Sequence, residues 1–182
     1  IVLTERQEEQ FIRYYELLIQ WNKVMNLTGI TEFDQVLLKH FADSLSIAGT
    51  VDMQKINTCI DVGTGAGFPG IPLKIAFPHL KVTLLDSLNK RLNFLCEYCM
   101  PYVKKGGYFV SYKAGQAEEE IREGKKAISL LGGKLEKTES FQLCQTDMDR
   151  TLVVIKKVKE TPKKYPRKPG TPAKEPLGLE KA

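Results

Sequence analysis

The chain has 182 residues, 42% of them hydrophobic and 27% charged, a composition typical of one soluble globular domain. No apolar run approaches the roughly 20 residues that a membrane-spanning helix needs. The first ten residues, in which acidic residues follow a short apolar start, do not resemble a signal peptide. These features exclude a membrane span within this sequence, and we expect a cytoplasmic protein without membrane contact.

The net charge of +5 is concentrated at one end of the chain. Residues 1–150 carry 18 Lys and Arg against 19 Asp and Glu, whereas residues 151–182 carry 9 against 3. A neutral body with a basic tail indicates a local contact with a polyanion. A solvated tail that only aids solubility is the alternative.

The N-terminal part of the chain predicts two helices. Thr4 and Gln7 have the spacing of a capping box, and apolar residues then recur every three or four positions to an end near Trp21, which we expect in the core. A second helix is predicted near residues 33–46. His40 within it is expected to be packed or surface-facing rather than to carry a proton.

From residue 58 onward, short apolar strands alternate with helices. This alternation predicts right-handed crossovers and an α/β fold with a mostly parallel sheet. The tail from Thr161 is too rich in proline for helix or sheet. Predicted strands span 58–62, 81–86, 108–113 and 151–158, and predicted helices span 72–76, a segment beginning at Ser87, and 117–130.

The cysteines are expected to be reduced and structural. Cys96 and Cys99 form one Cys-x-x-Cys pair, whereas a structural zinc site usually needs two such pairs or nearby histidines. The two histidines, His40 and His79, lie far away in the sequence. We therefore expect no metal site.

The stretch IDVGTGAGFPGIPL, residues 60–73, contains two overlapping glycine patterns. The first pattern, typical of a loop that holds S-adenosylmethionine, consists of Asp61, Gly63, Gly65 and Gly67. The second, the dinucleotide fingerprint of nicotinamide and flavin enzymes, consists of Gly65, Gly67 and Gly70. In both kinds of site, an acidic residue about 20 positions later binds the ribose hydroxyls. Asp86 has a suitable position for either pattern.

Details of the loop favour the methyl donor. Gly63 directly follows the predicted strand, so the dinucleotide interpretation leaves Gly63 and Thr64 unexplained. Asp61 can hold the loop through backbone N–H groups or approach the amino end of S-adenosylmethionine, but it would repel an anionic pyrophosphate. Pro69 and Pro72 also remove N–H donors that a pyrophosphate would need. A glycine turn without a ligand is the third possibility.

Five segments resemble, in order, the signature blocks of one bacterial family, the glucose-inhibited division protein B family. Members of this family methylate N7 of a guanine in small-subunit (16S) ribosomal RNA. The resemblance implies a Rossmann-like methyltransferase fold with a mostly parallel sheet and an N-terminal helical cap. The blocks are WNKVMNLTGIT, LLKHFADSL, DVGTGAGFPGIPLKIAFP, LLDSLNKR and TPKKYPRKPGTPAKEPL. The implied single domain, 1–182, consists of a cap (1–50), a core (56–160) and a basic, proline-rich tail (161–182).

The resemblance implies S-adenosylmethionine as the cofactor. The loop glycines would wrap its methionine part, with Phe68 on its surface. Asp86 would bind the ribose hydroxyls, and Ser87 would orient Asp86. The implied cofactor-binding residues are Asp61, Gly63, Thr64, Gly65, Gly67, Phe68, Asp86 and Ser87.

Ribosomal RNA or the small ribosomal subunit is the implied partner, and no obligate protein partner is expected. Guanine N7 carries a lone pair and no proton, so the reaction needs no general base. Asp43 is a candidate to stabilise the cationic purine. Asn26 could bind a base edge or cap a turn. The tail contacts are assigned to Lys163, Lys164, Arg167 and Lys168, because a stiff basic segment can lie along phosphates.

Two other functions remain open at this point. One is an NAD(P)-binding oxidoreductase, and the other is a non-catalytic RNA-binding module that keeps a decayed methyltransferase fold. The family also has a further stretch after Leu95, with an adenine-contacting acidic turn and an arginine near the donor. We expect a segment of about 30 residues or more to be missing between 95 and 96, rather than a naturally shorter sheet. Such a loss would compromise adenine binding and activity.

Overall fold

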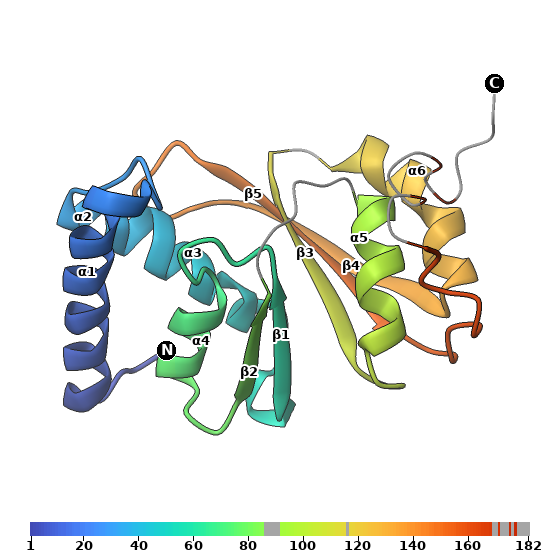
Figure 1. The fold of residues 1–182 in the computed structure, drawn as a ribbon, viewed down its shortest axis with the longest axis horizontal. Helices are drawn as coiled ribbons and strands as arrows, with labels where there is room; N and C mark the ends of the chain where they lie inside the picture. The colour runs from blue at the N-terminus through green and yellow to red at the C-terminus, as the bar shows by residue number, and fades with distance from the viewer. Residues whose placement is uncertain (86–91, 116, 169–170, 172–174, 176, 178–182) are drawn as a thin grey trace. The chain divides into compact units, whose positions relative to one another are not determined.

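The chain forms two compact units, which we describe separately. Unit 1 comprises Ile1–Leu88 and Leu143–Asp147, and unit 2 comprises Asn89–Gln142 and Met148–Ala182. Figure 1 shows the elements of this computed structural model. The structure describes residues 1–85, 92–115, 117–168, 171, 175 and 177.

Unit 1 begins with the long helix α1 (Glu5–Met25). The predicted capping box is present: the Thr4 hydroxyl accepts from the Gln7 backbone N–H, and the Gln7 side chain accepts from the Thr4 backbone N–H at 2.9 Å. The helix runs past its predicted end and closes at Asn26, whose backbone is left-handed with φ 48°. Trp21 therefore lies on a continuing helix, and it is 54% exposed. The prediction of a core position for Trp21 is wrong.

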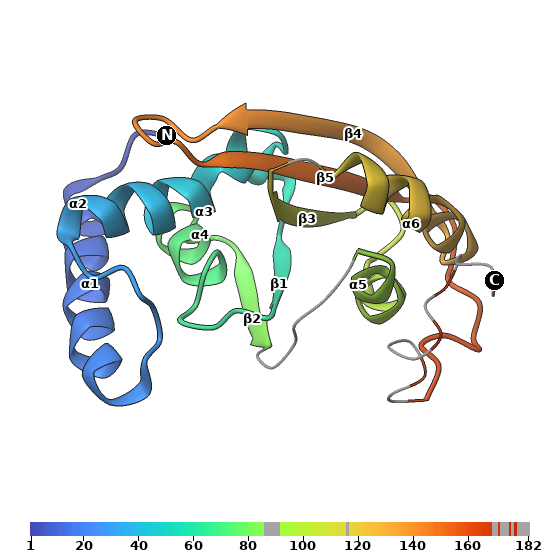
Figure 2. The ribbon, with the colours of Figure 1, turned by 90° about the horizontal axis from the view of Figure 1, so that it is seen from above.

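The second predicted helix is confirmed as one helical run over residues 33–49. Part of this run is π-helical, a form often found at functional sites. Figures 1 and 2 show α1, this run and α4 (Gly70–Ala76) beside one another. The run consists of α2 (Phe33–Val36), π-helix η1 (Leu37–Ala42), α3 (Asp43–Leu45) and 3-10 helix η2 (Ser46–Gly49). A separate 3-10 helix, η3 (Met53–Lys55), follows the run. Their shared core is Phe11, Leu18, Val36, Phe41 and Ile75.

The predicted parallel pairing is confirmed for two strands. Strands β1 (Thr58–Val62) and β2 (Lys81–Leu85) run parallel, with Asp61 opposite Leu84. Helix α4 connects them and packs against the sheet (Figure 1). This β1–α4–β2 arrangement is what the alternation of apolar segments predicted.

Unit 2 contains a three-stranded antiparallel sheet of order β3-β5-β4. The prediction of a mostly parallel sheet is wrong for this unit, because an unpredicted strand, β4, returns directly into β5. The chain reverses its direction between β4 and β5, and β5 is antiparallel to both β3 and β4. A short connection suffices for an antiparallel pair. The elements are α5 (Leu92–Cys99), 3-10 helix η4 (Met100–Tyr102), β3 (Tyr108–Ala114), α6 (Glu118–Leu130), β4 (Gly133–Gln142) and β5 (Asp149–Lys157).

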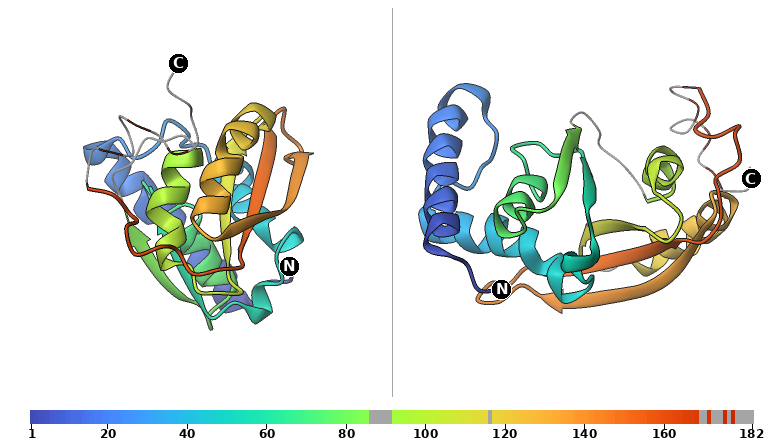
Figure 3. Two further views of the ribbon diagram at one scale, coloured as in Figure 1. Left: turned by 90° about the vertical axis from the view of Figure 1, so that its right-hand side faces the viewer. Right: turned by 90° about the horizontal axis from the view of Figure 1, so that it is seen from below.

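Helices α5 and α6 cover one face of this sheet (Figures 1 and 3). Val153 and Ile155 point to this face from the central strand β5 and are fully buried. The apolar burial of this layer stabilises unit 2. Its core consists of Leu92, Cys96, Met100, Ala117, Ile121, Ile128, Leu131, Val153 and Ile155.

None of the four cysteines, all of them among the described residues, forms a disulfide, and Cys96 and Cys99 are buried. Among the described residues, no three His, Cys, Asp or Glu side chains lie together as metal ligands would. No helix in the described part of the chain is long and apolar enough to span a bilayer.

Candidate functional site

The glycine loop joins β1 to α4 in unit 1. Strand β1 ends at Val62, and Gly63 follows with φ 84° while its N–H donates to the Leu85 carbonyl at 2.6 Å. Gly65 and Gly67 also have positive φ, of 52° and 105°. The interpretation in which Gly63 closes the strand is confirmed. Three positive-φ positions within five residues are inexpensive only for glycine.

Asp61 ties the loop to the start of α4. Its side chain is buried, at 7% exposure, and its Oδ2 accepts from the Gly70 N–H at 2.8 Å. A Cβ on Gly70 would lie 2.3 Å from Leu84 Cδ2 and 2.9 Å from Asp61 Oδ2. Asp61 therefore has the first of its two predicted roles, holding the loop through a backbone N–H group.

Helix α1 holds the same loop from the other side. The Tyr14 hydroxyl donates to the Ala66 carbonyl at 2.7 Å, and the Gln7 side-chain amide donates to the carbonyls of Ile75 and Ala76 at 2.8 and 3.0 Å. Burial, with the Asp61 carboxylate nearby, raises the pKa of Tyr14 far above its usual range, so the hydroxyl remains a donor. Sequence reasoning missed Tyr14, because the helical period shows which side of α1 is apolar but not which carbonyl a hydroxyl reaches.

Phe68 joins the loop to the helical run. Its ring stacks on His40 with centroids 4.5 Å apart, and lies 5.5 Å from the Tyr14 ring. His40 Nε2 lies 2.8 Å from Thr28 Oγ1, which accepts from the Ile30 N–H at 3.0 Å. His40, predicted to be packed or surface-facing, is half-buried and packs its ring on Phe68. Residues from three separate sequence blocks thus meet at one place in unit 1.

The loop leaves both space and an unused polar atom. Thr64 is 7% exposed, and its Oγ1 has no hydrogen-bond partner among the described residues. A Cβ added to Gly65 would meet no atom of the described residues within 4 Å. A buried hydroxyl without a partner is costly unless a ligand or water completes it. The loop therefore has the features of a ligand site.

The other predicted residues of unit 1 lie near the helical run or outside the described residues. Asp43 begins α3, and its carbonyl accepts from the Ser46 hydroxyl at 2.6 Å. Asn26 closes α1 through its backbone N–H, which donates to the Asn22 carbonyl at 3.1 Å, and its side chain is exposed. Asp86 and Ser87 lie outside the described residues.

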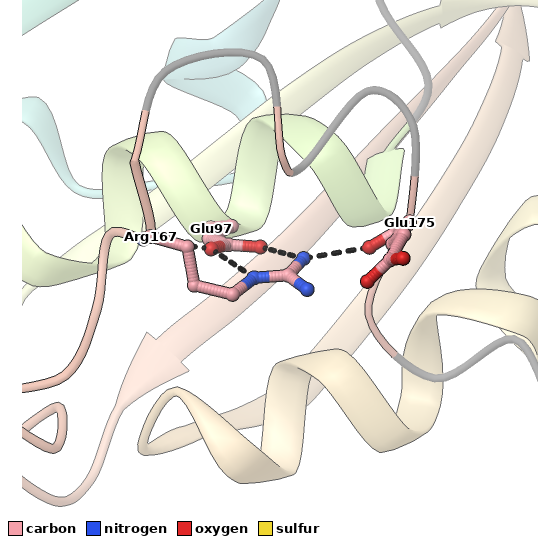
Figure 4. Close-up of polar contacts among 3 residues, drawn as sticks. All are labelled: Glu97, Arg167 and Glu175. Atoms are coloured by element: carbon pink, nitrogen blue, oxygen red, sulfur yellow. Dashed lines mark hydrogen bonds and ion pairs between the residues drawn. The ribbon is translucent and has the colours of Figure 1, made fainter.

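The basic tail is anchored to unit 2. The side chains of Lys163, Lys164 and Lys168 are exposed. Arg167 instead forms a bidentate ion pair with the buried Glu97, with Nε–Oε1 2.8 Å and Nη2–Oε2 2.7 Å (Figure 4). Lys157, at the end of β5 just before the tail, is fully buried and donates to the Met100 carbonyl.

The sequence profile of rRNA small subunit methyltransferase G matches residues 7–97 of the chain. Proteins named ribosomal RNA small subunit methyltransferase G are also similar over nearly the whole chain. The protein from Lachnoclostridium phytofermentans is 48% identical, over 96% of this chain and 91% of its own length. Those from Bacillus subtilis and Listeria monocytogenes are 46% and 44% identical, each over 97% of this chain and 93% and 94% of their own lengths. The chain belongs to the rRNA small subunit methyltransferase G family.

Members of the family are longer than this chain in their matched region. The alignment with the L. phytofermentans methyltransferase G spans 221 positions, 39 more than the 182 residues present here. At least 39 aligned positions therefore have no counterpart in this chain. Family membership also leaves the dinucleotide interpretation of the glycine loop without support.

Cys59, two residues before Asp61 on β1, gives the loop region of this chain a measurable pH dependence. Burial, together with the Asp61 carboxylate, raises the pKa of its thiol to about 11. The Cys59 thiolate forms less readily in the folded state than in the unfolded state, so the raised pKa contributes to the free energy of unfolding. This contribution is complete below about pH 9 and is lost as the pH rises through about 11. We expect the unfolding free energy of the wild type to fall about 2–3 kcal/mol more than that of Cys59→Ala between pH 8 and pH 11. Urea unfolding of both proteins between pH 8 and pH 11 tests this difference. Unfolding free energies that change in parallel with pH for the wild type and Cys59→Ala would contradict it.

Proposed function

We propose that this chain transfers a methyl group from S-adenosylmethionine to N7 of a guanine in small-subunit (16S) ribosomal RNA. Family membership supports the reaction class, and members of the family use S-adenosylmethionine as methyl donor. The observation that carries the proposal is the glycine loop after β1. It is held by Asp61 and Tyr14, and the Thr64 hydroxyl within it has no hydrogen-bond partner in the part of the chain that the structure describes.

We propose a Rossmann-like methyltransferase domain for the whole chain. Its parts are a helical cap (1–50), a core (56–160) and a basic tail (161–182), and it acts in the cytoplasm. The positions that relatives have and this chain lacks fall after Leu95 in this proposal. The family profile stops matching at residue 97, which supports that location.

The donor would be held by the backbone of Gly63, Thr64, Gly65 and Gly67 at its methionine part. Bound there, S-adenosylmethionine supplies a methyl group on a positively charged sulfur. The Phe68 ring already stacks on His40, so we assign its donor contact to the backbone. The assignments of the ribose hydroxyls to Asp86 and of the orienting role to Ser87 stay predictions.

The protein's own part in the reaction is orientation. Guanine N7 attacks with its lone pair and releases no proton, so no side chain has to act as a base. In-line alignment of N7 with the methyl carbon can lower the barrier by about 7–11 kcal/mol in favourable cases. Asp43 is our candidate for the carboxylate that stabilises the cationic purine. Asn26 is our candidate for a base-edge contact in addition to its capping role.

The RNA target should be a loop or an opened region. The major groove of A-form RNA, where N7 lies, is too narrow for side chains. The exposed cations of the tail would hold the phosphates beside such a region.

The direct test is transfer of labelled methyl to 16S ribosomal RNA or small subunits from cells that lack this activity, followed by identification of the nucleoside. We expect 7-methylguanosine. A Gly65→Asn variant is the matched control: asparagine tolerates φ 52°, but its side chain enters the open space beside the loop. It should fold and lose donor binding. Any other methylated nucleoside contradicts the proposal, and tight RNA binding without methyl transfer would favour a decayed RNA-binding module.

Alanine at Lys163, Lys164 and Lys168 together should weaken RNA binding. Removing three phosphate contacts flattens the slope of log K against log salt by about 2–3, since each contact contributes about 0.7–0.9. Filter binding at several salt concentrations measures both quantities. Alanine at the exposed Lys104, Lys105 and Lys125, also of unit 2, changes the net charge equally and should leave the slope unchanged. Equal slopes for all three proteins would show that the tail does not contact RNA.

A further inference from the structure

Helix α5 carries a carboxylate that cannot reach solvent. Glu97 is 0% exposed, and a buried charge is costly unless it is paired and hydrogen-bonded. Its partner lies 70 positions away along the chain, in the proline-rich tail. The pairing therefore fixes a segment that has no helix or strand of its own.

Arg167 satisfies both oxygens of Glu97 (Figure 4). Its backbone N–H donates to Oε1 at 3.0 Å, its Nε donates to Oε1 at 2.8 Å, and its Nη2 donates to Oε2 at 2.7 Å. The same Nη2 donates to the Glu175 carbonyl at 2.7 Å. Bidentate guanidinium–carboxylate pairs fix orientation as well as distance. Arg167 is 24% exposed at its side chain, and this pairing leaves little of its guanidinium for a phosphate.

A second anchor lies six residues earlier. The Thr161 hydroxyl donates to the Leu131 carbonyl at 2.7 Å and accepts from the ammonium of Lys157. Between the two anchors, the Tyr165 ring packs against the core of unit 2. The segment 161–168, which we call the basic strap, is thus held at both ends and in the middle.

The side chains of the basic strap differ in their exposure to solvent. Tyr165 and Arg167 are half-buried, whereas Lys163, Lys164 and Lys168 are exposed. The ammonium of Lys164 lies 5.3 Å from the centroid of the Tyr165 ring, which holds it close to the strap. A segment fixed in this way presents its ammonium groups without first losing conformational freedom.

We propose that the Glu97–Arg167 pair holds the basic strap in the conformation that presents Lys163, Lys164 and Lys168 to the phosphates of RNA. Arg167 is then a positioning residue and not a phosphate contact. This inference rests on the proposed function, because RNA is the polyanion that the family's substrate provides.

A Glu97→Gln variant separates positioning from charge. It removes one negative charge, so electrostatics alone would tighten RNA binding. Loss of the anchor has the opposite effect, because a loosened strap has to be ordered again on binding. We expect RNA binding about tenfold weaker, with the salt slope of the wild type because all three lysines remain. Arg167→Lys keeps the positive charge but not the bidentate geometry, and it should behave in the same way.

Trypsin digestion of the chain without RNA gives an independent readout. The bonds after Lys163 and Lys164 lie within the basic strap, and their cleavage should be about tenfold faster in both variants, because local opening exposes them. Circular dichroism and thermal unfolding establish the temperature at which wild type and variants are all folded. Binding and digestion are then measured at that temperature.

The outcomes separate this inference from the proposed function. Weaker RNA binding and faster cleavage in both variants support the positioning role. Wild-type or tighter RNA binding by Glu97→Gln overturns it, even if the Lys163/Lys164/Lys168 variant confirms the RNA contact. If that lysine variant binds RNA like the wild type, the role of the strap in RNA binding is overturned, while methyl transfer to RNA is still tested by its own assay.

Discussion

Replacing Gly67 by alanine is expected to destabilise the chain by about 2–6 kcal/mol and to abolish donor binding. The backbone at Gly67 has φ 105°, which L-residues rarely adopt. An added Cβ would lie 2.4 Å from Ile71 Cδ1 and 3.0 Å from the Tyr14 hydroxyl. Backbone strain and overpacking each cost about 1–3 kcal/mol. Urea unfolding measures the stability, and equilibrium dialysis with S-adenosylmethionine measures the binding.

Two further variants separate the causes. Gly49→Ala adds the same methyl group where nothing lies within 4 Å, and it should leave the unfolding free energy unchanged within about 0.5 kcal/mol. Adding Ile71→Val to Gly67→Ala removes the clashing Cδ1 atom and should restore part of the stability, but not the part due to φ. A Gly67→Ala protein as stable as the wild type would contradict the observed loop geometry.

Asp61→Ala is expected to cost about 2–4 kcal/mol and Asp61→Asn about half as much. Alanine leaves the buried Gly70 N–H without an acceptor and loses a charged hydrogen bond, whereas the asparagine carbonyl can still accept. Both variants should bind S-adenosylmethionine at least tenfold more weakly, because they remove a negative charge beside the loop that is proposed to hold this positively charged donor. Thermal unfolding and equilibrium dialysis measure the two effects.

Asp34 on α2 provides the matched control for Asp61. It is exposed, so Asp34→Asn and Asp34→Ala make the same changes in charge without touching the loop. Both should leave donor binding at the wild-type level. If the Asp61 variants bind the donor as well as the Asp34 variants do, Asp61 has no part in the donor site.

The sequence predicts those features of the fold that depend on neighbouring residues. The capping box of Thr4 and Gln7 spans three positions, and Gly63 follows directly after a strand, so both are visible in a short stretch of sequence. The apolar period predicts the helix near residues 33–46 in the same way, but neither its π-helical part nor its continuation to Gly49. Local chemistry decides these features before any tertiary contact forms.

The missed features depend on residues far apart in the sequence. The pair of Glu97 and Arg167 spans 70 positions, and no period or motif in the sequence joins them. Strand β4 was missed because its alternation is carried mostly by polar and charged side chains that are only half-buried on one face. That strand decides the direction of β5, so one missed element also made the predicted sheet type wrong. Trp21 was misplaced because aromatic character alone does not determine which side of a long helix faces solvent.

The side chain of Gln7 couples the ends of two helices. Its carbonyl oxygen completes the first turn of α1, while its amide nitrogen closes the last carbonyls of α4. Neither end can fray without breaking the bonds of the other, so the first turn of the chain and the helix behind the glycine loop should open as one cooperative unit. Amide hydrogen exchange would then report a shared opening free energy for two segments almost 70 residues apart, and opening of the N-terminus would loosen the helix that follows the glycine loop.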